Sequence, residues 1–252
     1  MITPALNSAA TLDETLASVR EQHYPGSLEH IVVDGGSTDA TLELVRESGL
    51  RHVSEPDRGL THALNKGIAM AREPIVGSLN SDDTYLPGAL DRVGRAFAGD
   101  PDVKWVTGRC RIVGARGQEI RRGVNAYKNL FLAHHSFGLH LVHNYVSAPA
   151  TFVSRDELRA VGGYDERFAY SADYDLWLKL GQRSAPFVLD HELATFRMDG
   201  ESLSLTGFER QFEEHARNAS EHGEGHRAAV ALNRVASRAI VLAYRTRRRL
   251  DG

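Results

Sequence analysis

The chain has 252 residues, 42% of them hydrophobic and 25% charged, which is typical of a globular protein with one large α/β domain or two small ones. Its net charge of −3 gives no general reason to expect nucleic-acid binding, and its single cysteine, Cys110, excludes an internal disulfide and fits a reducing compartment. No apolar run approaches the roughly 20 residues that span a bilayer. No signal peptide is recognisable, so we expect a cytoplasmic protein.

The first hundred residues alternate short apolar runs with segments of helical spacing. The apolar runs predict strands at residues 2–7, 30–34, 50–54 and 76–79. The other segments predict helices at residues 11–21, 41–48, 61–71 and 87–97. This alternation is typical of βαβ units and a parallel sheet, so we expect an α/β fold.

The second half is less regular. It predicts strands at residues 103–108, 110–113, 150–153 and 193–197, with a turn near Gly114 and Gly117. Helices are expected from residue 155, at 173–180, and from 208 onward. No element is assigned to residues 127–143, which are rich in aromatic side chains and histidine. Cys110 is expected to be a small buried apolar residue.

Four acidic residues follow strands of the predicted sheet: Asp34, Asp57, Asp82 and Asp83. Ligands of open α/β sheets bind at the carboxyl ends of the strands. Carboxylates there can accept hydrogen bonds from a nucleobase or a ribose, and can hold a diphosphate through a hard divalent cation. Alternatively, each acid only caps a helix or faces water. Neither a dinucleotide-binding glycine fingerprint nor a P-loop occurs in the sequence.

Six segments, in this order, resemble the motifs of the family-two inverting glycosyltransferases: ITPALN at 2–7, VDGGSTD at 33–39, EPDRG at 55–59, NKG at 65–67, NSDD at 80–83 and SADYDLW at 171–177. The resemblance covers roughly residues 1–200. It implies a GT-A fold, with a Rossmann-like, mostly parallel sheet flanked by helices, a smaller acceptor-side region and C-terminal helices. It further implies one domain at 1–204, with a nucleotide-binding half (1–100) and an acceptor-binding half (101–204), followed by a helical extension at 205–252.

The resemblance also implies roles for the residues that would bind the donor. The nucleobase pocket is expected to be lined by Thr3, Pro4 and Leu6. Hydrogen bonds from the base or ribose are expected to be accepted by Asp34 and Asp57. The residues expected near the sugar are Asn65 and Lys66.

The segment from Asn80 to Asp82 stands where the family has its D-x-D motif. Asp82 would therefore ligate Mn²⁺ or Mg²⁺, and Asp83 would help to hold the ribose, the sugar or metal-bound water. Asn80 replaces the first acid of the motif. Its amide can accept a hydrogen bond, but it brings no charge to a metal.

Asp173 corresponds to the general base of the family, which takes the proton of the acceptor hydroxyl. Ala172 precedes it, where many relatives have Glu, and Asp175 would point elsewhere on a helix. Alternatively, Asp173 only opposes the dipole of its helix. Arg197 resembles an arginine near the diphosphate, and Asp199 stands where relatives often have histidine.

Two further patterns have more than one interpretation. The histidines at 134, 135, 140 and 143 match no standard zinc spacing, so they either contribute to an acceptor pocket or simply pack. Residues 228–244 form a basic amphipathic helix, which either lies on an anionic membrane or packs on the domain. Its apolar residues at helical spacing are Val230, Leu232, Val235, Ala239, Ile240 and Leu242.

Together these features predict a metal-assisted inverting glycosyltransferase of polysaccharide biosynthesis. It would move a sugar from a nucleotide-diphosphate sugar to a hydroxyl of a glycan or a lipid-linked intermediate, without nucleic acid as a partner. If the C-terminal helix binds lipid, the protein would lie peripherally at the inner face of the membrane. One alternative is a sugar-nucleotide nucleotidyltransferase, although residues 4–10 contain no Lys or Arg to grip a triphosphate. Another is a non-catalytic nucleotide-sugar-binding module of the same fold.

Overall fold

The computed structural model describes residues 1–198 and 207–250, apart from the side chains of residues 243, 244 and 247–250. The expected domain boundary at residue 204 and the residue Asp199 lie outside this described part.

Three parallel strands form the first sheet, in the order β1-β2-β3. They are β1 (Ile2–Ala5), β2 (Ile31–Asp34) and β3 (Arg51–Ser54). The connecting helices are α1 (Leu12–Arg20) and α2 (Thr41–Glu47), and α3 (Leu60–Met70) follows β3. Every residue of β1 and β2 is buried, as expected for parallel strands covered on both faces. The predicted strands and helices of this part are confirmed.

The fourth predicted strand departs from the parallel sheet that the first half of the chain predicted. The strand β4 (Ile75–Gly77) belongs to a second sheet, where it pairs antiparallel with β7 (Thr151–Ser154). Its continuation still reaches the first sheet, because the Leu79 amide donates to the Ile2 carbonyl at 2.9 Å. Gly77 permits the antiparallel pairing, since a Cβ there would lie 2.6 Å from the ring of Phe152. Residues 78–79 therefore join the two sheets.

The second sheet has the strand order β4-β7-β6-β8-β5. Its remaining strands are β5 (Thr84–Tyr85), β6 (Trp105–Val113) and β8 (Phe187–Arg197). The two strands predicted at 103–108 and 110–113 are one strand, β6, whose register with parallel β8 is irregular around Arg109. The prediction mistook this irregularity for a break. The two-residue strand β5 was not predicted, and β8 begins earlier than expected.

The helices of the second half include two that the sequence did not predict, α5 (Arg122–Ala133) and α6 (Phe137–Val142). Of α5 only Asn125 and Leu132 are buried, so its apolar spacing is weak. The other helices that follow α3 are α4 (Ala89–Gly99), η1 (Ala148–Ala150), α7 (Arg155–Ala160), α8 (Ala172–Gly181), α10 (Phe208–His222) and α11 (Arg227–Leu250). Of these, the helices at α4, α7, α8 and from residue 208 onward confirm predictions.

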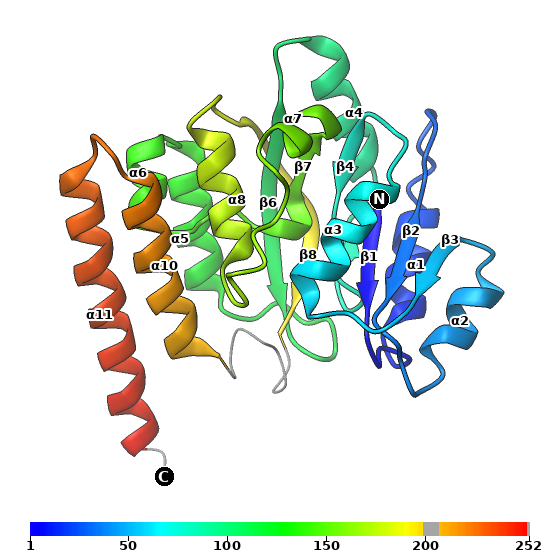
Figure 1. The fold of residues 1–252 in the computed structure, drawn as a ribbon, viewed down its shortest axis with the longest axis horizontal. Coiled ribbons are helices and arrows are strands. Elements are labelled where there is room, and N and C mark those ends of the chain that lie inside the picture. Colours follow the sequence, from blue (N-terminus) through cyan, green and yellow to red (C-terminus); the bar gives the residue numbers. More distant parts are fainter. Residues whose placement is uncertain (199–206, 251–252) are drawn as a thin grey trace.

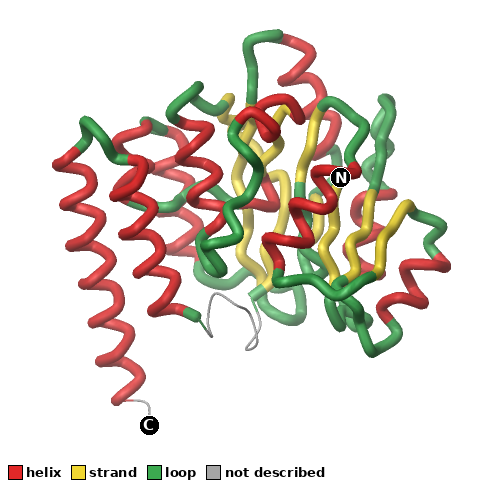
Figure 2. The backbone as a smooth tube through the Cα atoms, in the orientation of Figure 1, coloured by secondary structure: helices red, strands yellow, loops and turns green. Residues whose placement is uncertain are grey.

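Figures 1 and 2 show how these elements are arranged. Helices α5, α6, α8, α10 and α11 gather at the side of the second sheet, at the opposite end of the molecule from α2. Helix α11 is the outermost of this group (Figure 1). No helix in the described ranges combines the length and apolar composition needed to cross a bilayer.

The largest hydrophobic cluster spans both sheets. Trp105 of β6 stacks on Trp177 of α8 with ring centroids 6.0 Å apart, and both rings are almost completely buried. The same cluster includes Ile2 of β1, which is 1% exposed and packs beneath α3. Gly67 of α3 allows this approach, because a Cβ there would lie 2.4 Å from Ile2 Cγ2.

We expect Gly67→Ala to lower the free energy of unfolding by about 1–3 kcal/mol, because the new Cβ would overlap the buried Ile2 side chain and force it or α3 to shift. Urea denaturation measures this change. Gly123→Ala is the matched control, since a Cβ at exposed Gly123 would meet no atom within 4 Å apart from its chain neighbours and the backbone of its own helix. It should leave stability unchanged or raise it by up to about 1 kcal/mol. Equal effects of the two changes would contradict this account of the packing.

Candidate active site

The segment Asn80–Asp83 forms the connection between β4 and β5. Asp83 is completely buried, and its Oδ1 accepts a hydrogen bond from the Arg197 backbone amide at 2.8 Å. Its Oδ2 is buried without a hydrogen-bond partner among the described residues. Burial, and secondarily the charge of Asp82, raises the pKa of the Asp83 carboxyl well above its usual value. Asp82 itself is only partly buried, so its carboxylate is the more accessible of the pair.

Arg197, at the end of β8, holds this connection in place. Its Nε donates to the Asp82 carbonyl at 2.9 Å, its Nη1 to the Ala115 carbonyl at 2.7 Å and its Nη2 to Glu14 Oε2 at 2.5 Å. Every guanidinium nitrogen therefore has a protein partner, and the side chain is 8% exposed. This arrangement makes Arg197 a residue that positions the two acids. Its expected place near a diphosphate remains a prediction.

The predicted nucleobase pocket brings together Leu6, Gly35 and Asp57. A Cβ at Gly35 would lie 2.6 Å from Asp57 Oδ2 and 3.5 Å from Leu6 Cδ1. Leu6 is 56% exposed, and Asp57 is partly buried with its Oδ1 accepting the Gly59 amide at 2.8 Å. An exposed apolar side chain beside a carboxylate that is partly open to solvent is suited to a base with N–H groups.

Asp34, Thr3 and Pro4 lie deeper than the resemblance suggests. Asp34 is completely buried and accepts hydrogen bonds from the hydroxyls of Ser37 and Ser54 at 2.5 and 2.6 Å. Thr3 is also completely buried, with its hydroxyl 2.9 Å from His30 Nε2. Pro4 is buried in β1. These contacts support the backbone of the pocket, and direct contact with a ligand remains a prediction for all three residues.

Asn65 and Lys66 of α3 both bind the protein backbone. The Asn65 Oδ1 atom accepts a hydrogen bond from the Tyr164 backbone amide at 3.0 Å, and its Nδ2 donates to the Tyr164 carbonyl at 2.8 Å. These two bonds connect α3 to the second half of the chain. Lys66 Nζ lies 2.9 Å from Glu55 and 3.4 Å from the Pro56 carbonyl. These two residues fix the loop that carries Asp57 and the loop that precedes α8.

Asp173 lies in the first turn of α8. Its Oδ1 accepts the Tyr174 amide at 2.8 Å, and its Oδ2 accepts from Asn144 Nδ2 at 3.2 Å. Burial raises the pKa of Asp173, and these hydrogen bonds and the charge of Lys128 oppose the rise. Asp175 points elsewhere, as predicted, and pairs with His222 and Lys179. Asp173 is thus a carboxylate held in one orientation without a salt bridge among the described residues.

Lys128 of α5 is a neighbour of Asp173 that the sequence did not predict. It lies close enough to Asp173 for each charge to shift the pKa of the other. Its ammonium donates to Ser147 Oγ at 2.8 Å, and no described carboxylate lies within 4 Å of it. Burial lowers the pKa of Lys128. Nothing in the sequence marks this lysine, because it belongs to no recognised motif and its helix was not predicted.

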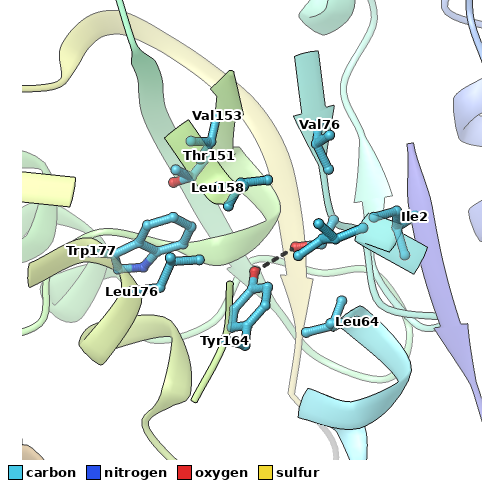
Figure 3. A pocket seen from close by; sticks show the side chains of 11 residues that line it. Ile2, Leu64, Val76, Thr151, Val153, Leu158, Tyr164, Leu176 and Trp177 are labelled. Carbon is cyan, nitrogen blue, oxygen red and sulfur yellow. Dashed lines mark hydrogen bonds between the residues drawn. The ribbon is translucent and has the colours of Figure 1, made fainter. Parts of the chain in front are cut away.

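Tyr164 links the two groups of acids. Its hydroxyl lies 3.4 Å from the hydroxyl of Ser78, which precedes the Asn80–Asp83 connection, and Figure 3 marks this contact with a dashed line. Burial raises the pKa of Tyr164 to about 12, with a further contribution from Asp173. The labelled side chains in Figure 3 surround a cavity of about 10 Å³. That volume is about enough for one water molecule, so this cavity is not a substrate site.

The acids of the Asn80–Asp83 connection fit a hard divalent cation only in part. Asp82 supplies an accessible carboxylate, and Asp83 has a buried oxygen without a partner among the described residues. However, no group of three or more His, Cys, Asp or Glu side chains in the described part could hold a metal ion. A cation here would therefore take most of its ligands from a bound diphosphate and water, which is the usual behaviour of Mg²⁺ at substrate sites.

The histidines of the aromatic segment pack rather than converge. His140 is completely buried against Tyr145 and Tyr174, and burial lowers its pKa to about 3. His135 Nδ1 lies 2.9 Å from the Tyr145 hydroxyl. The described residues hold no cluster of metal ligands here either.

Comparison with known proteins identifies the family. The model of "Glycosyl transferase family 2" matches residues 1–152. An uncharacterised glycosyltransferase of Mycobacterium tuberculosis is 32% identical over 206 residues, which cover 79% of this chain and 75% of the relative. The chain belongs to glycosyltransferase family 2. The family resemblance expected from the motifs is therefore confirmed, and the protein is an enzyme of the glycosyltransferase class.

Two further similarities extend this assignment. The chondroitin synthase of Escherichia coli is 25% identical over 224 residues, which cover 86% of this chain but only 31% of that protein. A mannosyltransferase of Pyrobaculum calidifontis, solved in complex with GDP-Man and Mn²⁺, has a similar structure, with a TM-score of 0.68 at 20% sequence identity. The match covers 96% of this glycosyltransferase and 74% of the mannosyltransferase. This structural match confirms the expected GT-A type of fold.

For this glycosyltransferase, we expect Arg197→Met to lower the free energy of unfolding by about 1–3 kcal/mol, because the carbonyls of Asp82 and Ala115 lose their donors. Chemical denaturation measures the loss. Arg116→Met is the control, since Arg116 is exposed; we expect it to change stability by less than about 0.5 kcal/mol. An unchanged free energy of unfolding in Arg197→Met would show that these hydrogen bonds of Arg197 do not stabilise the fold.

We expect Lys128→Met to raise the pKa of Asp173 further, because the ammonium charge that favours the ionised carboxyl is removed. A ¹³C NMR titration of the Asp173 side-chain carboxyl measures this pKa directly. Lys104→Met, on a lysine that contacts the Pro101 carbonyl, should leave the titration unchanged. A pKa that stays constant or falls in Lys128→Met would refute the electrostatic coupling.

Proposed function

We propose that this enzyme transfers a sugar from a nucleotide-diphosphate sugar to a hydroxyl acceptor with inversion at the anomeric carbon. The observation that carries the proposal is the pairing of two sites within one fold. The Asn80–Asp83 connection offers an accessible carboxylate at the carboxyl end of β4. Asp173 offers a second, separately oriented carboxylate.

The first half of the chain is the proposed donor side. Leu6 and Asp57 would contact the nucleobase or ribose, and the carboxylates of Asp82 and Asp83 would face the diphosphate through a divalent cation. The solved relative with GDP-Man and Mn²⁺ supports this use of the fold. When bound, Mn²⁺ or Mg²⁺ would offset the charge that gathers on the departing diphosphate. The expected division at about residue 100 into donor and acceptor halves is part of this proposal.

Asp173 is the proposed general base. As the acceptor oxygen attacks the anomeric carbon, its proton passes to Asp173, the bond from that carbon to the diphosphate oxygen breaks, and the electron pair leaves with the diphosphate. Asn144 and the Tyr174 amide hold the carboxylate in one orientation. Lys128 favours its ionised form, the form that can accept the proton. Because Ala172 replaces the usual glutamate, this base acts without an adjacent carboxylate.

The proposed acceptor is a glycan or a lipid-linked intermediate. Similarity to a protein named chondroitin synthase supports a glycan hydroxyl. A lipid-linked acceptor would require access to the inner face of a membrane, for which α11 is the candidate element. A role in polysaccharide biosynthesis is compatible with either acceptor.

Two other functions make different demands on these residues. A nucleotidyltransferase needs cations near the loop after β1 to hold a triphosphate, and residues 4–10 contain none. A non-catalytic module needs no oriented base, whereas Asp173 is oriented by two hydrogen bonds. Both observations favour glycosyl transfer.

A panel of nucleotide sugars, tested for binding and hydrolysis with and without Mn²⁺ or Mg²⁺, examines the proposal. We expect one donor to bind in a metal-dependent manner. Asp82→Ala should abolish this dependence. Asp173→Asn should keep donor binding but lower turnover by a factor of about 10² to 10⁴, the usual contribution of a general base.

Asp102→Asn is the matched control for the second variant, since Asp102 is an exposed aspartate outside the site. It should leave both binding and turnover unchanged. Failure of the wild-type protein to bind any sugar nucleotide with either metal would overturn the proposal. Unchanged turnover in Asp173→Asn would overturn the role of Asp173 alone.

A further inference from the structure

Helix α11 carries apolar residues on two faces. The sequence had suggested that they all lie on one face. One face packs on the protein: Asn233 is 1% exposed and donates to the Val142 carbonyl at 3.0 Å, and Ser237 is 7% exposed. Val230 and Ile240 are partly buried on this face. The inner contact is therefore made in part by polar side chains.

The opposite face of α11 is exposed and apolar. Leu232, Val235 and Leu242 are 55%, 64% and 66% exposed. With Ala228 and Ala239, which are also exposed, they recur at spacings of three and four residues and so form one stripe along the helix. Val235 and both leucines of α11 whose placement is described thus face away from the domain, although a helix that only packed on the domain would bury such side chains.

Arginines border this stripe on one side. Arg227, Arg234, Arg238 and Arg245 are all exposed, and each lies next to the stripe when the helix is viewed along its axis. Arg245 pairs with Glu209 of α10, and Arg234 donates to Ser220, whereas no described carboxylate lies within 4 Å of Arg227 or Arg238. The helix contains seven arginines and no acidic residue, although the whole chain has a net charge of −3.

We propose that the outer face of α11 binds the surface of an anionic lipid bilayer, with the helix lying parallel to the membrane. The stripe would enter the boundary between headgroups and acyl chains, and the arginines beside it would contact lipid phosphates. The position of α11 suits this arrangement, because it is the outermost helix at its end of the molecule (Figure 1). At 1.5 Å per residue, a 24-residue helix offers a contact about 36 Å long.

The charge of the helix favours a membrane over a second copy of this chain. Pairing of two α11 helices through their stripes would bring two rows of arginines together without a carboxylate on either helix. Like charges at such an interface repel. An anionic bilayer supplies the opposite charge and an apolar layer at once. This surface is separate from the proposed catalytic residues, so neither a donor nor an acceptor is needed to test it.

Flotation of the 252-residue chain with lipid vesicles tests the proposal. We expect binding to vesicles that contain phosphatidylglycerol, little binding to vesicles of phosphatidylcholine alone, and weaker binding as salt is added. The double variant Leu232→Ser/Val235→Ser should reduce the partition coefficient by roughly tenfold or more. Its matched control is Val124→Ser/Leu130→Ser, which makes the same two changes at exposed residues of α5.

A second pair of variants tests the charge. Arg227→Gln/Arg238→Gln should weaken binding to the anionic vesicles, whereas Arg46→Gln/Arg92→Gln, at exposed positions of α2 and α4, should not. Circular dichroism melting verifies that each variant folds. Absence of wild-type binding to anionic vesicles, or equal binding by the stripe variant and its control, would overturn the proposal. A dimer in light scattering that Leu232→Ser/Val235→Ser dissociates would instead assign the face to a second copy.

Discussion

The structure of the candidate site depends on one buried contact, between the end of β8 and the Asn80–Asp83 connection. Residues 83 and 197 are far apart in the sequence, yet the Arg197 amide and side chain fix both Asp83 and the backbone of Asp82. The same guanidinium reaches α1 through Glu14 and the turn after β6 through Ala115. In addition to burial, the charge of Asp82 contributes to the raised pKa of the Asp83 carboxyl, whereas the amide and the charge of Arg197 oppose this rise. Helix α1, the end of β8 and the turn after β6 thereby meet at the acids.

The turn that carries Asp173, on the proposed acceptor side, is supported in a different way, by the C-terminal helices. Ser171, which precedes α8 and is completely buried, receives two hydrogen bonds from Asn218 of α10 and donates to Glu214 of the same helix. The turn that presents Asp173 is thus held by a segment about 40 residues later in the chain. Helix α10 is therefore an integral support of the turn that presents Asp173, and α11 covers α10 from outside (Figure 1).

Much of the fold, and the choice of candidate site residues, followed from the sequence for identifiable reasons. The buried runs of β1 and β2 and the regular spacing in α1 and α3 are local signals, and Asp82 and Asp173 stand in ordered motifs. The pairing of β4 with β7, the irregular register at Arg109 and the helix that carries Lys128 are products of tertiary contact. The deep placement of Thr3 and Asp34 was missed for a similar reason, since a motif gives residue order but not depth. The two faces of α11 could be separated only once its neighbours were known.

The pair of hydrogen bonds between Asn65 and the Tyr164 backbone restricts which side chains can occupy position 65. The Asn65 side-chain amide accepts from the N–H of Tyr164 and donates to the carbonyl of the same residue, as a neighbouring backbone would in a sheet. Aspartate has the same shape, but its ionised carboxylate would face that carbonyl with no hydrogen to offer. Glutamine has the right groups on a longer stem. A substitution that looks conservative by charge or size is therefore not tolerated equally here, because this position requires both a donor and an acceptor at a fixed reach from the helix.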